Sequence, residues 1–253
     1  MKILLTNDDS LDSPLFHFAV DYFQAMGDVV AVVPSEEQSW KGKAMTRFGT
    51  MHLEPLDGFA CATYAFSGTP ADCANFGIYH LFEGKPDLVI SGVNMGSNVG
   101  LGFAVSSGTI GAALEANLAG LPAVALSQVL PRNAFKHWIE HRALPPDVQE
   151  TLLASCRAMV RQSFDFLQTQ EGFYTAPVTW NVNMPGEPVA DWQVVSTTLG
   201  HTVYTSCFKP EDGGYHHNID RPEIDEREGT DGIVVRNGHV SVTRLDIRAF
   251  GQG

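Results

Sequence analysis

The N-terminal stretch Lys2–Asp9, KILLTNDD, constrains the fold of this chain more than any other segment. Its apolar run Ile3–Leu5 is short and ends at a turn signal, which is typical of a buried central strand in a parallel sheet. Asp8 and Asp9 follow at the carboxyl end of that strand, the edge at which open α/β sheets bind ligands. Because adjacent carboxylates repel each other, a hard divalent cation is the simplest means of neutralising them. The alternative is that both aspartates are turn and helix-capping residues.

The first half of the chain alternates between strand and helix patterns. Apolar residues at helical spacing predict a helix over Pro14–Met26. Capping residues predict two more helices, which begin at Ser67–Asp72 and at Ser106–Thr109. This alternation predicts an α/β fold with a doubly wound, mostly parallel sheet and right-handed crossovers. The expected strands are Asp28–Val33, Asp87–Ser91 and Pro122–Ser127, with a hairpin of Thr50–Leu56 and Cys61–Phe66 around Asp57-Gly58.

The second half of the chain has weaker patterns. Apolar spacing predicts a long amphipathic helix over Asp147–Leu167 and a strand over Val178–Asn183. The other expectations are an irregular linker over Leu130–Pro146, a hairpin within Trp192–Phe208 that turns near Gly200, a charged loop or extended arm over Lys209–Gly232, and a final hairpin within Val234–Leu245 around Asn237-Gly238.

The composition narrows the class of protein and of partner. Of the 253 residues, 29 are acidic and 16 basic, and the net charge of −13 disfavours binding to a nucleic-acid polymer. The cysteines are scattered without a CxxC pair, as expected of reduced thiols. No signal peptide is expected, and no apolar run approaches the ~20 residues of a membrane span. We therefore expect a cytoplasmic protein that acts on a small molecule and binds no membrane.

Several nucleotide-binding and hydrolase motifs are absent from the sequence. No GxGxxG follows the first strand, no GxxxxGK[ST] is present, and no GxSxG marks a nucleophile elbow. The carboxylates after the first strand are adjacent, which argues against the Asp-x-Asp pattern of haloacid-dehalogenase-type phosphatases. His216 and His217 point in opposite directions in an extended chain, so we interpret them as ordinary loop residues.

Polar side chains recur at the ends of successive strands. Asp8 and Asp9 follow the first strand. Ser39 lies in the loop after the second strand, and Asn94 follows the strand that ends at Ser91. Carboxylate, hydroxyl and amide oxygens are hard ligands, which suit Mg²⁺, Mn²⁺ or Ca²⁺ better than zinc. These four side chains are therefore candidate metal ligands, although Asn94 alone is equally explained as a turn residue.

A candidate phosphate site follows in the sequence. The helix opened by Ser107-Gly108-Thr109 offers free backbone N–H groups and the positive end of a helix dipole. A site for a hard metal ion beside a phosphate-binding site is typical of a phosphoryl-transfer hydrolase. The plainer interpretation is that Ser107 and Thr109 are ordinary helix caps.

With these motifs in order along the chain, the sequence resembles the SurE (survival protein E) family of metal-dependent 5'/3'-nucleotidases. The resemblance covers most of the chain and is densest in residues 1–127. The matching segments are Ile3–Asp9 (ILLTNDD), Ser39, Gly68–Cys73 (GTPADC), Ser91–Gly100 (SGVNMGSNVG), Ser107–Ala116 (SGTIGAALEA), Asn181–Pro185 (NVNMP), and GTDG and GHVSVT within Gly229–Thr243.

The resemblance implies a Rossmann-like core with a metal and phosphate site in residues 1–130. Residues 131–253 would supply the rest of the core, a protruding β-rich extension and an oligomerisation arm. The implied protein is a homodimer or homotetramer that hydrolyses nucleoside monophosphates at the 5' or 3' position, and also short polyphosphate. The implied cofactor is one divalent metal ion per subunit, Mg²⁺ or Mn²⁺, held by Asp8, Asp9, Ser39 and Asn94.

We therefore expect a metal-dependent phosphatase of nucleotides with Asp8, Asp9 and Asn94 as catalytic residues. Asp8 would act either as a base toward water or as a nucleophile. One alternative is a catalytically weak nucleotide- or metal-binding protein on the same fold, and another is a structural oligomer without a ligand. The residues expected to bind the substrate are Asn7, Trp40, Ser106, Ser107, Gly108 and Thr109.

Three positions depart from the pattern of the family. The family usually has glycine where this chain has Ser10 and Trp40, and it often has tyrosine where Ser106 stands. These departures leave the expected metal ligands unchanged and bear on the mouth of the pocket and on substrate preference. Trp40 is expected either to stack on a base or to pack against its own loop.

Overall fold

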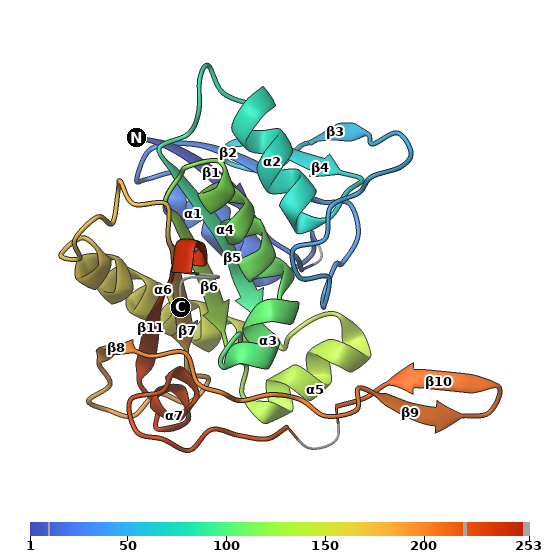
Figure 1. Ribbon diagram of the computed structural model, residues 1–253, viewed down its shortest axis with the longest axis vertical. Helices are drawn as coiled ribbons and strands as arrows, with labels where there is room; N and C mark the ends of the chain where they lie inside the picture. The colour runs from blue at the N-terminus through green and yellow to red at the C-terminus, as the bar shows by residue number, and fades with distance from the viewer. Residues whose placement is uncertain (10, 220–221, 250–253) are drawn as a thin grey trace.

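A nine-stranded sheet forms the centre of the computed structural model, which describes residues 1–9, 11–219 and 222–249 (Figure 1). Its strand order is β3-β4-β2-β1-β5-β6-β7-β11-β8. The strands from β4 to β7 in this order run parallel, whereas β3 and β11 pair antiparallel with β4 and β7. The strands are β1 (Lys2–Thr6), β2 (Asp28–Pro34), β3 (Leu53–Leu56), β4 (Ala62–Phe66), β5 (Leu88–Met95), β6 (Ala123–Gln128), β7 (Thr179–Met184), β8 (Val194–Thr197) and β11 (Val240–Leu245).

The order of the strands places a topological switch point between β1 and β5. The chain winds from β1 through β2 to β4 in one direction, then from β5 through β6 to β7 in the other. Loops that leave the carboxyl ends of β1 and β5 therefore separate, and a crevice for a ligand forms between them. Asp8 and Asp9 follow β1, and Asn94 lies near the end of β5, so both motifs meet at this crevice. The α/β fold with a doubly wound, mostly parallel sheet is confirmed.

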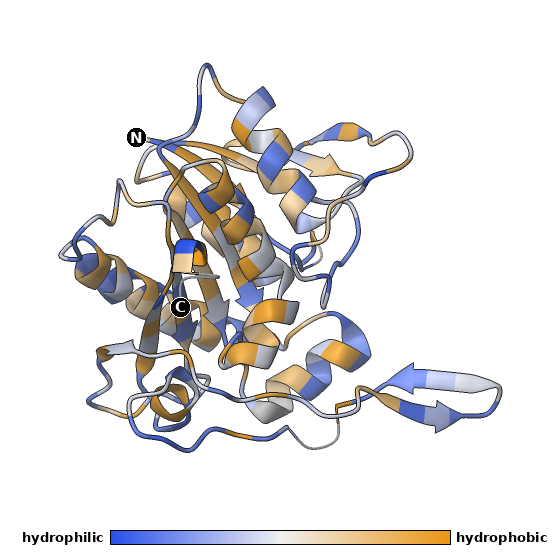
Figure 2. Ribbon diagram, in the orientation of Figure 1, coloured by the Kyte–Doolittle hydropathy of each residue, from blue (hydrophilic) through white to orange (hydrophobic). Residues whose placement is uncertain are grey.

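Helices cover both faces of the sheet, as its apolar central strands require. The helices α1 (Pro14–Phe23) and α6 (Pro146–Leu167) pack on one face, and α2 (Pro70–His80) and α4 (Gly108–Leu118) pack on the other. In Figure 2 the central strands are mostly apolar, in orange, between these two helical layers. Thr69 caps α2 as expected, because its hydroxyl accepts a hydrogen bond from the backbone N–H of Asp72 at 3.1 Å.

The prediction of an irregular linker over Leu130–Pro146 is wrong, because Arg132–His141 form the helix α5. The helix ends at Arg142, whose φ of 52° is left-handed. Trp138 is buried in the core and anchors α5 to the rest of the protein. Prolines on both sides of this segment made it look irregular in the sequence.

The prediction of a C-terminal hairpin within Val234–Leu245 is also wrong. Asp231–Arg236 form the short helix α7, and β11 joins the main sheet between β7 and β8. Asn237-Gly238 therefore ends a helix instead of turning a hairpin. Gly238 has a φ of 82°, the left-handed conformation that commonly follows the end of a helix.

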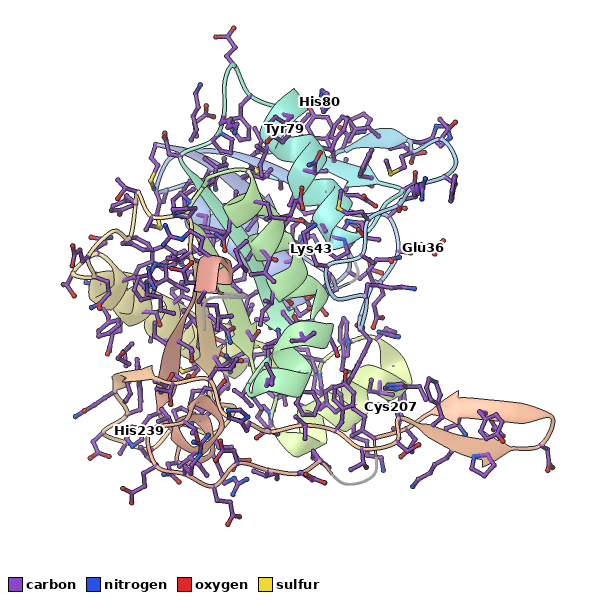
Figure 3. All side chains as sticks on the ribbon, viewed as in Figure 1. Glu36, Lys43, Tyr79, His80, Cys207 and His239 are labelled. Atoms are coloured by element: carbon purple, nitrogen blue, oxygen red, sulfur yellow. The ribbon has the colours of Figure 1, made fainter. Side chains whose placement is uncertain are left out.

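The region before α7 also differs from the sequence interpretation. Trp192–Phe208 contributes the single strand β8 to the sheet, with no hairpin at Gly200. A hairpin forms further on, from β9 (Phe208–Glu211) and β10 (Gly214–His217), within the expected arm. This hairpin projects from the body of the protein in Figure 1, and Cys207 marks its base in Figure 3. The remaining elements are α3 (Leu101–Ser106) and the 3₁₀ turn Ile247–Ala249.

Other expectations from the sequence are confirmed. The hairpin of β3 and β4 turns at Asp57-Gly58, where Gly58 has a φ of 85°. The cysteines are unpaired, and they are Cys61, Cys73, Cys156 and Cys207. Within residues 1–9, 11–219 and 222–249, none of the helices has the length and apolar character needed to span a bilayer.

Candidate active site

A pocket of about 440 Å³ opens where the carboxyl ends of β1 and β5 separate. Most of the side chains predicted from the sequence meet there. Asn7, Gly108 and Thr109 are buried and do not line the pocket, and Asn7 and Thr109 have 1% and 0% exposure. Ser10 lies outside the described residues. The predicted residues that line the pocket are Asp8, Asp9, Ser39, Trp40, Asn94, Ser106 and Ser107.

Asp8 is fixed from two directions at the end of β1. Its side chain is buried, and its Oδ1 accepts a hydrogen bond of 2.7 Å from the hydroxyl of Thr109 on α4. Its backbone oxygen accepts a hydrogen bond of 2.9 Å from the N–H of Gln38, which belongs to the loop after β2. The carboxylate of Asp8 is therefore positioned by a neighbouring helix and a neighbouring loop.

Asp9 connects β1 to β5. Its Oδ2 accepts a hydrogen bond of 2.7 Å from the backbone N–H of Met95. Asn7 shapes the turn, because its Oδ1 accepts hydrogen bonds from the backbone N–H groups of Asp8 and Asp9 at 2.9 and 3.5 Å. The Nδ2 of Asn7 is buried and has no hydrogen-bond partner among the described residues. Asn7 thus organises the two carboxylates, and its contact with a substrate stays a prediction.

The two carboxylates lie in surroundings that disfavour their negative charge. Burial is the main cause and raises the pKa of both Asp8 and Asp9. The charge of Asp8 raises the pKa of Asp9 further, and Glu37 acts on both in the same direction. Hydrogen bonds from Thr109 and from the N–H of Met95 lower the pKa values without cancelling these effects. A cation bound between the carboxylates would supply the missing compensation.

Asn94 follows an irregularity in β5. The register between β5 and β6 shifts between Ser91 and Asn94, and such bulges re-aim side chains next to active sites. Gly92 permits this shape, because its φ is 126° and an added Cβ would lie 2.3 Å from the backbone oxygen of Leu126. The Nδ2 of Asn94 is directed to the hydroxyl of Ser127 at 3.4 Å. The amide oxygen of Asn94 is therefore the atom left for a ligand.

Asn98 lines the pocket, connects the groups behind it, and was not predicted from the sequence as a site residue. Its Nδ2 donates to the hydroxyls of Ser127 and Thr109 at 2.8 and 3.3 Å. Its backbone N–H donates to the side chain of Asn183, and its backbone oxygen accepts from the side chain of Asn181. Asn98 thus ties the partners of Asp8 and Asn94 to β7. The signal for it was present, since it follows Asn94 by four residues in the same glycine-rich segment.

Ser39 lies in the loop between β2 and β3 and lines the pocket. Its hydroxyl donates a hydrogen bond of 2.9 Å to Oε1 of Glu37, which leaves its lone pairs as acceptors. The other oxygen of Glu37 pairs with Arg142 of the α5 segment at 2.8 Å. Further along, Lys43 (labelled in Figure 3) reaches Glu115 on α4, with Nζ and Oε2 2.5 Å apart. The loop that carries Ser39 is thus held to both helices.

The N-terminus of α4 points at Asp8. Ser107 caps the helix, because its hydroxyl accepts a hydrogen bond of 3.1 Å from the N–H of Ile110. Gly108 is the first residue of the helix, and a Cβ added to it would lie 2.9 Å from Oδ2 of Asp8. The predicted phosphate cradle therefore lies directly beside the predicted catalytic carboxylate. Whether Ser107, Gly108 and Thr109 bind a phosphate stays a prediction.

An aromatic cluster forms the mouth of the pocket. Trp40 has a φ of 64°, and its ring centroid lies 5.8 Å from that of Phe103, 5.2 Å from that of Tyr204 and 4.9 Å from that of His217. Its contacts therefore come from α3 and from the chain around the hairpin. Ser106, where the family often has tyrosine, forms a hydrogen bond with the hydroxyl of Tyr204.

Several residues of the pocket had no clear signal in the sequence. His217, which the sequence placed in an ordinary loop, lies on β10 and lines the pocket, whereas His216 faces Glu211 at 3.5 Å. The others depend on α5, on the hairpin or on tertiary contacts. They are Glu37, Phe103, Phe135, Trp138, Ile139 and Arg142.

The donor set fits a hard divalent cation. In the part of the chain that the structure describes, no group of three or more His, Cys, Asp or Glu side chains is arranged to hold a metal ion. The predicted set has only two carboxylates, and it adds a hydroxyl and an amide oxygen that line the same pocket. Neither Asp8 nor Asp9 has an ion-pair partner among the described residues. Two unneutralised carboxylates, of which Asp8 is buried and Asp9 half-buried, suit Mg²⁺ or Mn²⁺ together with neutral oxygen donors.

Comparisons with known proteins agree with this geometry. The chain is 32% identical to the 5'-nucleotidase SurE of Methanocella arvoryzae, in a match that covers 99% of this chain and 94% of that protein. It is 36% identical to the 5'-nucleotidase SurE of Methanothermobacter thermautotrophicus, over 83% of this chain and 77% of that protein. The crystal structure of the SurE protein from Aquifex aeolicus superimposes with a TM-score of 0.71 and 28% identity, over 98% of this chain and 94% of that one. Residues 3–206 match the model of the family described as survival protein SurE, and the chain belongs to that family.

Proposed function

We propose that this protein is a phosphoric monoester hydrolase that acts on nucleoside monophosphates and depends on a divalent metal ion. The supporting observation is the convergence of two adjacent carboxylates, one buried and one half-buried, an amide oxygen and a helix N-terminus on one pocket. Its volume of about 440 Å³ lies in the range of pockets for small ligands. Relatives that cover nearly the whole chain are named 5'-nucleotidase. We extend the proposal to 3'-nucleotides and short polyphosphate, which present the same terminal phosphoryl group.

Asp8, Asp9, Ser39 and Asn94 are the residues that would hold the metal ion. When bound there, the metal would polarise a phosphoryl oxygen and lower the pKa of a water molecule. The chain's own groups account for the rest of the reaction. The free N–H groups in the first turn of α4 bind the non-bridging oxygens of the phosphoryl group and stabilise the charge that develops on them.

Asp8 has the position expected of the reacting carboxylate. Thr109 holds its Oδ1 by a hydrogen bond, so Oδ2 is the atom available to take a proton from water or to attack phosphorus. Gly108 leaves Oδ2 of Asp8 accessible, because a side chain at position 108 would clash with that oxygen. In this proposal Asn98 and Ser127 orient the residues that they contact, and Asn98 also lines the pocket.

The proposed assembly is a homodimer or homotetramer in the cytoplasm. The hairpin of β9 and β10 projects from the body of the protein, and we propose that it packs on a partner subunit (Figure 1). Pro210 and Lys209 both lie in β9, which discourages extension of the edge of that strand by further strands. Side-chain packing is therefore the expected mode of contact.

A phosphate-release assay tests the proposed function. The protein is treated exhaustively with a chelator and then assayed with adenosine 5'-monophosphate, adenosine 3'-monophosphate and tripolyphosphate. Release should be absent after chelation and should return on addition of Mg²⁺ or Mn²⁺. Full turnover in metal-free buffer would contradict the metal requirement. Absence of release from every substrate with metal present would contradict the hydrolase itself.

The aromatic mouth favours one alternative, a nucleotide-binding protein with weak catalysis. Trp40 replaces the usual glycine of the family and contacts three other rings at the mouth. This alternative predicts saturable nucleotide binding without multiple turnover. Calorimetry on the metal-loaded protein, run beside the phosphate assay, separates the two.

A further inference from the structure

α5 contributes an apolar face to the pocket. Phe135, Ile139 and Arg142 follow one another at intervals of four and three residues, so they lie along one side of the helix. All three line the pocket. Phe135 is 47% exposed and Ile139 is 56% exposed, so the protein's own core does not cover them. Trp138, on the adjoining side of α5, is 6% exposed and anchors the helix to the core.

The aromatic cluster at the mouth contributes a second apolar part of the same pocket. Trp40 and Phe103 both line it, and Trp40 remains 39% exposed after its contacts with neighbouring rings. Those contacts are edge-on or tilted, so they fix the orientation of the Trp40 ring while part of its surface stays accessible. Rigid, partly exposed aromatic rings are suited to contact with a flat ligand.

The pocket therefore has two ends with different chemistry. The end at the carboxyl edge of the sheet carries Asp8, Asp9 and Asn94, and suits a metal ion and a phosphoryl group. The end at α5 and Trp40 is mainly apolar and aromatic, and it also includes Arg142 and His217. A phosphate ester of a small alcohol would fill only the first end. A nucleobase joined to the phosphate through a sugar would also fill the second end, because the flat face of any base can stack on aromatic side chains.

We infer that α5 and Trp40 form a nucleobase subsite, in which Phe135 and Ile139 contact the base and make the enzyme prefer nucleoside monophosphates to base-free sugar phosphates. The inference rests on the proposed function for the phosphate end of the pocket.

Arg142 links α5 to the loop that carries Ser39. Its guanidinium is 2.8 Å from one carboxylate oxygen of Glu37, and the other oxygen accepts a hydrogen bond from Ser39. The C-terminal end of α5 is thereby joined to the loop that carries a proposed metal ligand. This contact and the burial of Trp138 both position α5 beside the pocket, where the helix can contact the outer part of a bound substrate.

The test compares kcat/KM for adenosine 5'-monophosphate and for ribose 5-phosphate, which has the same phosphorylated sugar and no base. The ratio of the two values measures the contribution of the base. Phe135→Ala should lower this ratio about tenfold, as expected for the loss of a stacking partner, and Ile139→Ala about fivefold. Phe135→Trp should retain the ratio, because it keeps an aromatic face. Phe48→Ala is the matched control, since Phe48 is 80% exposed and lies outside the pocket wall, and it should change nothing.

An unchanged ratio in Phe135→Ala and Ile139→Ala, with melting temperatures equal to that of the wild type, would overturn the inference. Loss of the ratio in Phe135→Trp as well would show that Phe135 only supports the helix, and would overturn it too. If the wild type releases phosphate from neither substrate, the proposed function fails. The binding of adenosine then tests the nucleobase subsite by itself. Saturable quenching of tryptophan fluorescence by adenosine that weakens in Phe135→Ala would then support the subsite, and no quenching would exclude it.

Discussion

Replacing Gly108 by alanine should remove most of the activity, because it moves Asp8. An added Cβ would lie 2.9 Å from both Cβ and Oδ2 of Asp8, and 3.1 Å from Cγ of Pro70. Heavy atoms in favourable contact are about 3.5–4.0 Å apart, so one of these groups must shift. Asp8 is buried and hydrogen-bonded to Thr109, and it cannot rotate into solvent. The displacement therefore falls on the carboxylate or on the N-terminus of α4.

The expected effect on activity is much larger than the effect on stability. Overpacking of this kind destabilises a protein by about 1–3 kcal/mol. The better helix propensity of alanine offsets at most about 1 kcal/mol of that loss, because this value applies to helix interiors and Gly108 is the first residue of α4. A misplacement of about 1 Å at a reacting group can lower turnover about 100-fold. Gly108→Ala should therefore fold normally and lose at least about 100-fold in kcat, and Gly108→Val should lose more.

The assay measures kcat at saturating Mg²⁺ together with the melting temperature of each variant. Gly232→Ala is the matched control, because Gly232 lies in the first turn of α7 and an added Cβ would be 3.7 Å from the nearest heavy atom, in Val99. The control should match the wild type in both measurements. If Gly108→Ala keeps more than about a third of the wild-type activity, the placement of Asp8 against α4 is not what catalysis requires, and the reasoning is refuted.

Asp8→Asn and Asp9→Asn should each lower kcat by at least ~10²-fold, and near-normal turnover at saturating metal would reduce that residue to a structural role. In metal-free protein Asp9→Asn should raise the melting temperature at pH 7, because burial and Asp8 raise the pKa of Asp9 and its ionisation opposes folding; a lower melting temperature would contradict this. Deletion of Glu211–Glu228 should shift the mass measured by light scattering toward the monomer, and an unchanged mass would exclude the arm from assembly. Trp40→Ala should raise KM for nucleoside monophosphates but not for a small phosphate ester without a ring, whereas equal losses on both would mean that Trp40 only supports the loop with Ser39.

The part of the site that the sequence predicted consists of residues tied to strand ends. Asp8, Asp9 and Asn94 follow short apolar runs that are typical of buried strands, and parallel strands bring their carboxyl ends to one edge. The position of these residues in the fold is therefore fixed by local pattern and by the handedness of the crossovers. Asn98 carried the same kind of signal, but its role appears only in tertiary contacts with Thr109, Ser127 and β7, and the contacts with β7 span 83 and 85 residues of sequence.

The part that the sequence did not predict depends on tertiary packing. The apolar residues of α5 do have helical spacing, but Pro131 and Pro145 bracket a segment of about three turns whose stability comes from the burial of Trp138. Asn237-Gly238 is equally compatible with a hairpin turn and with the end of a helix. Because β11 pairs with β7 and β8, it does not pair with the residues before Asn237, and these form a helix. His217 reaches the pocket only because β9 and β10 pair, which places its ring against Trp40.

Trp40 explains why the mouth of the pocket was the hardest part to predict. Its φ of 64° is left-handed, a conformation that costs a residue with a side chain about 1–2 kcal/mol and that a glycine would adopt freely. The ring contacts with Phe103, Tyr204 and His217 offset that strain, since aromatic pairs contribute about 0.5–1.5 kcal/mol each. Two of those three rings come from the chain that leads into and out of the hairpin, more than 160 residues away in the sequence. The contact between the rings of Trp40 and His217 therefore links the strained backbone at Trp40 to the position of β10 over the pocket. A glycine at this position would relieve the backbone and at the same time remove the contact that holds His217 at the mouth.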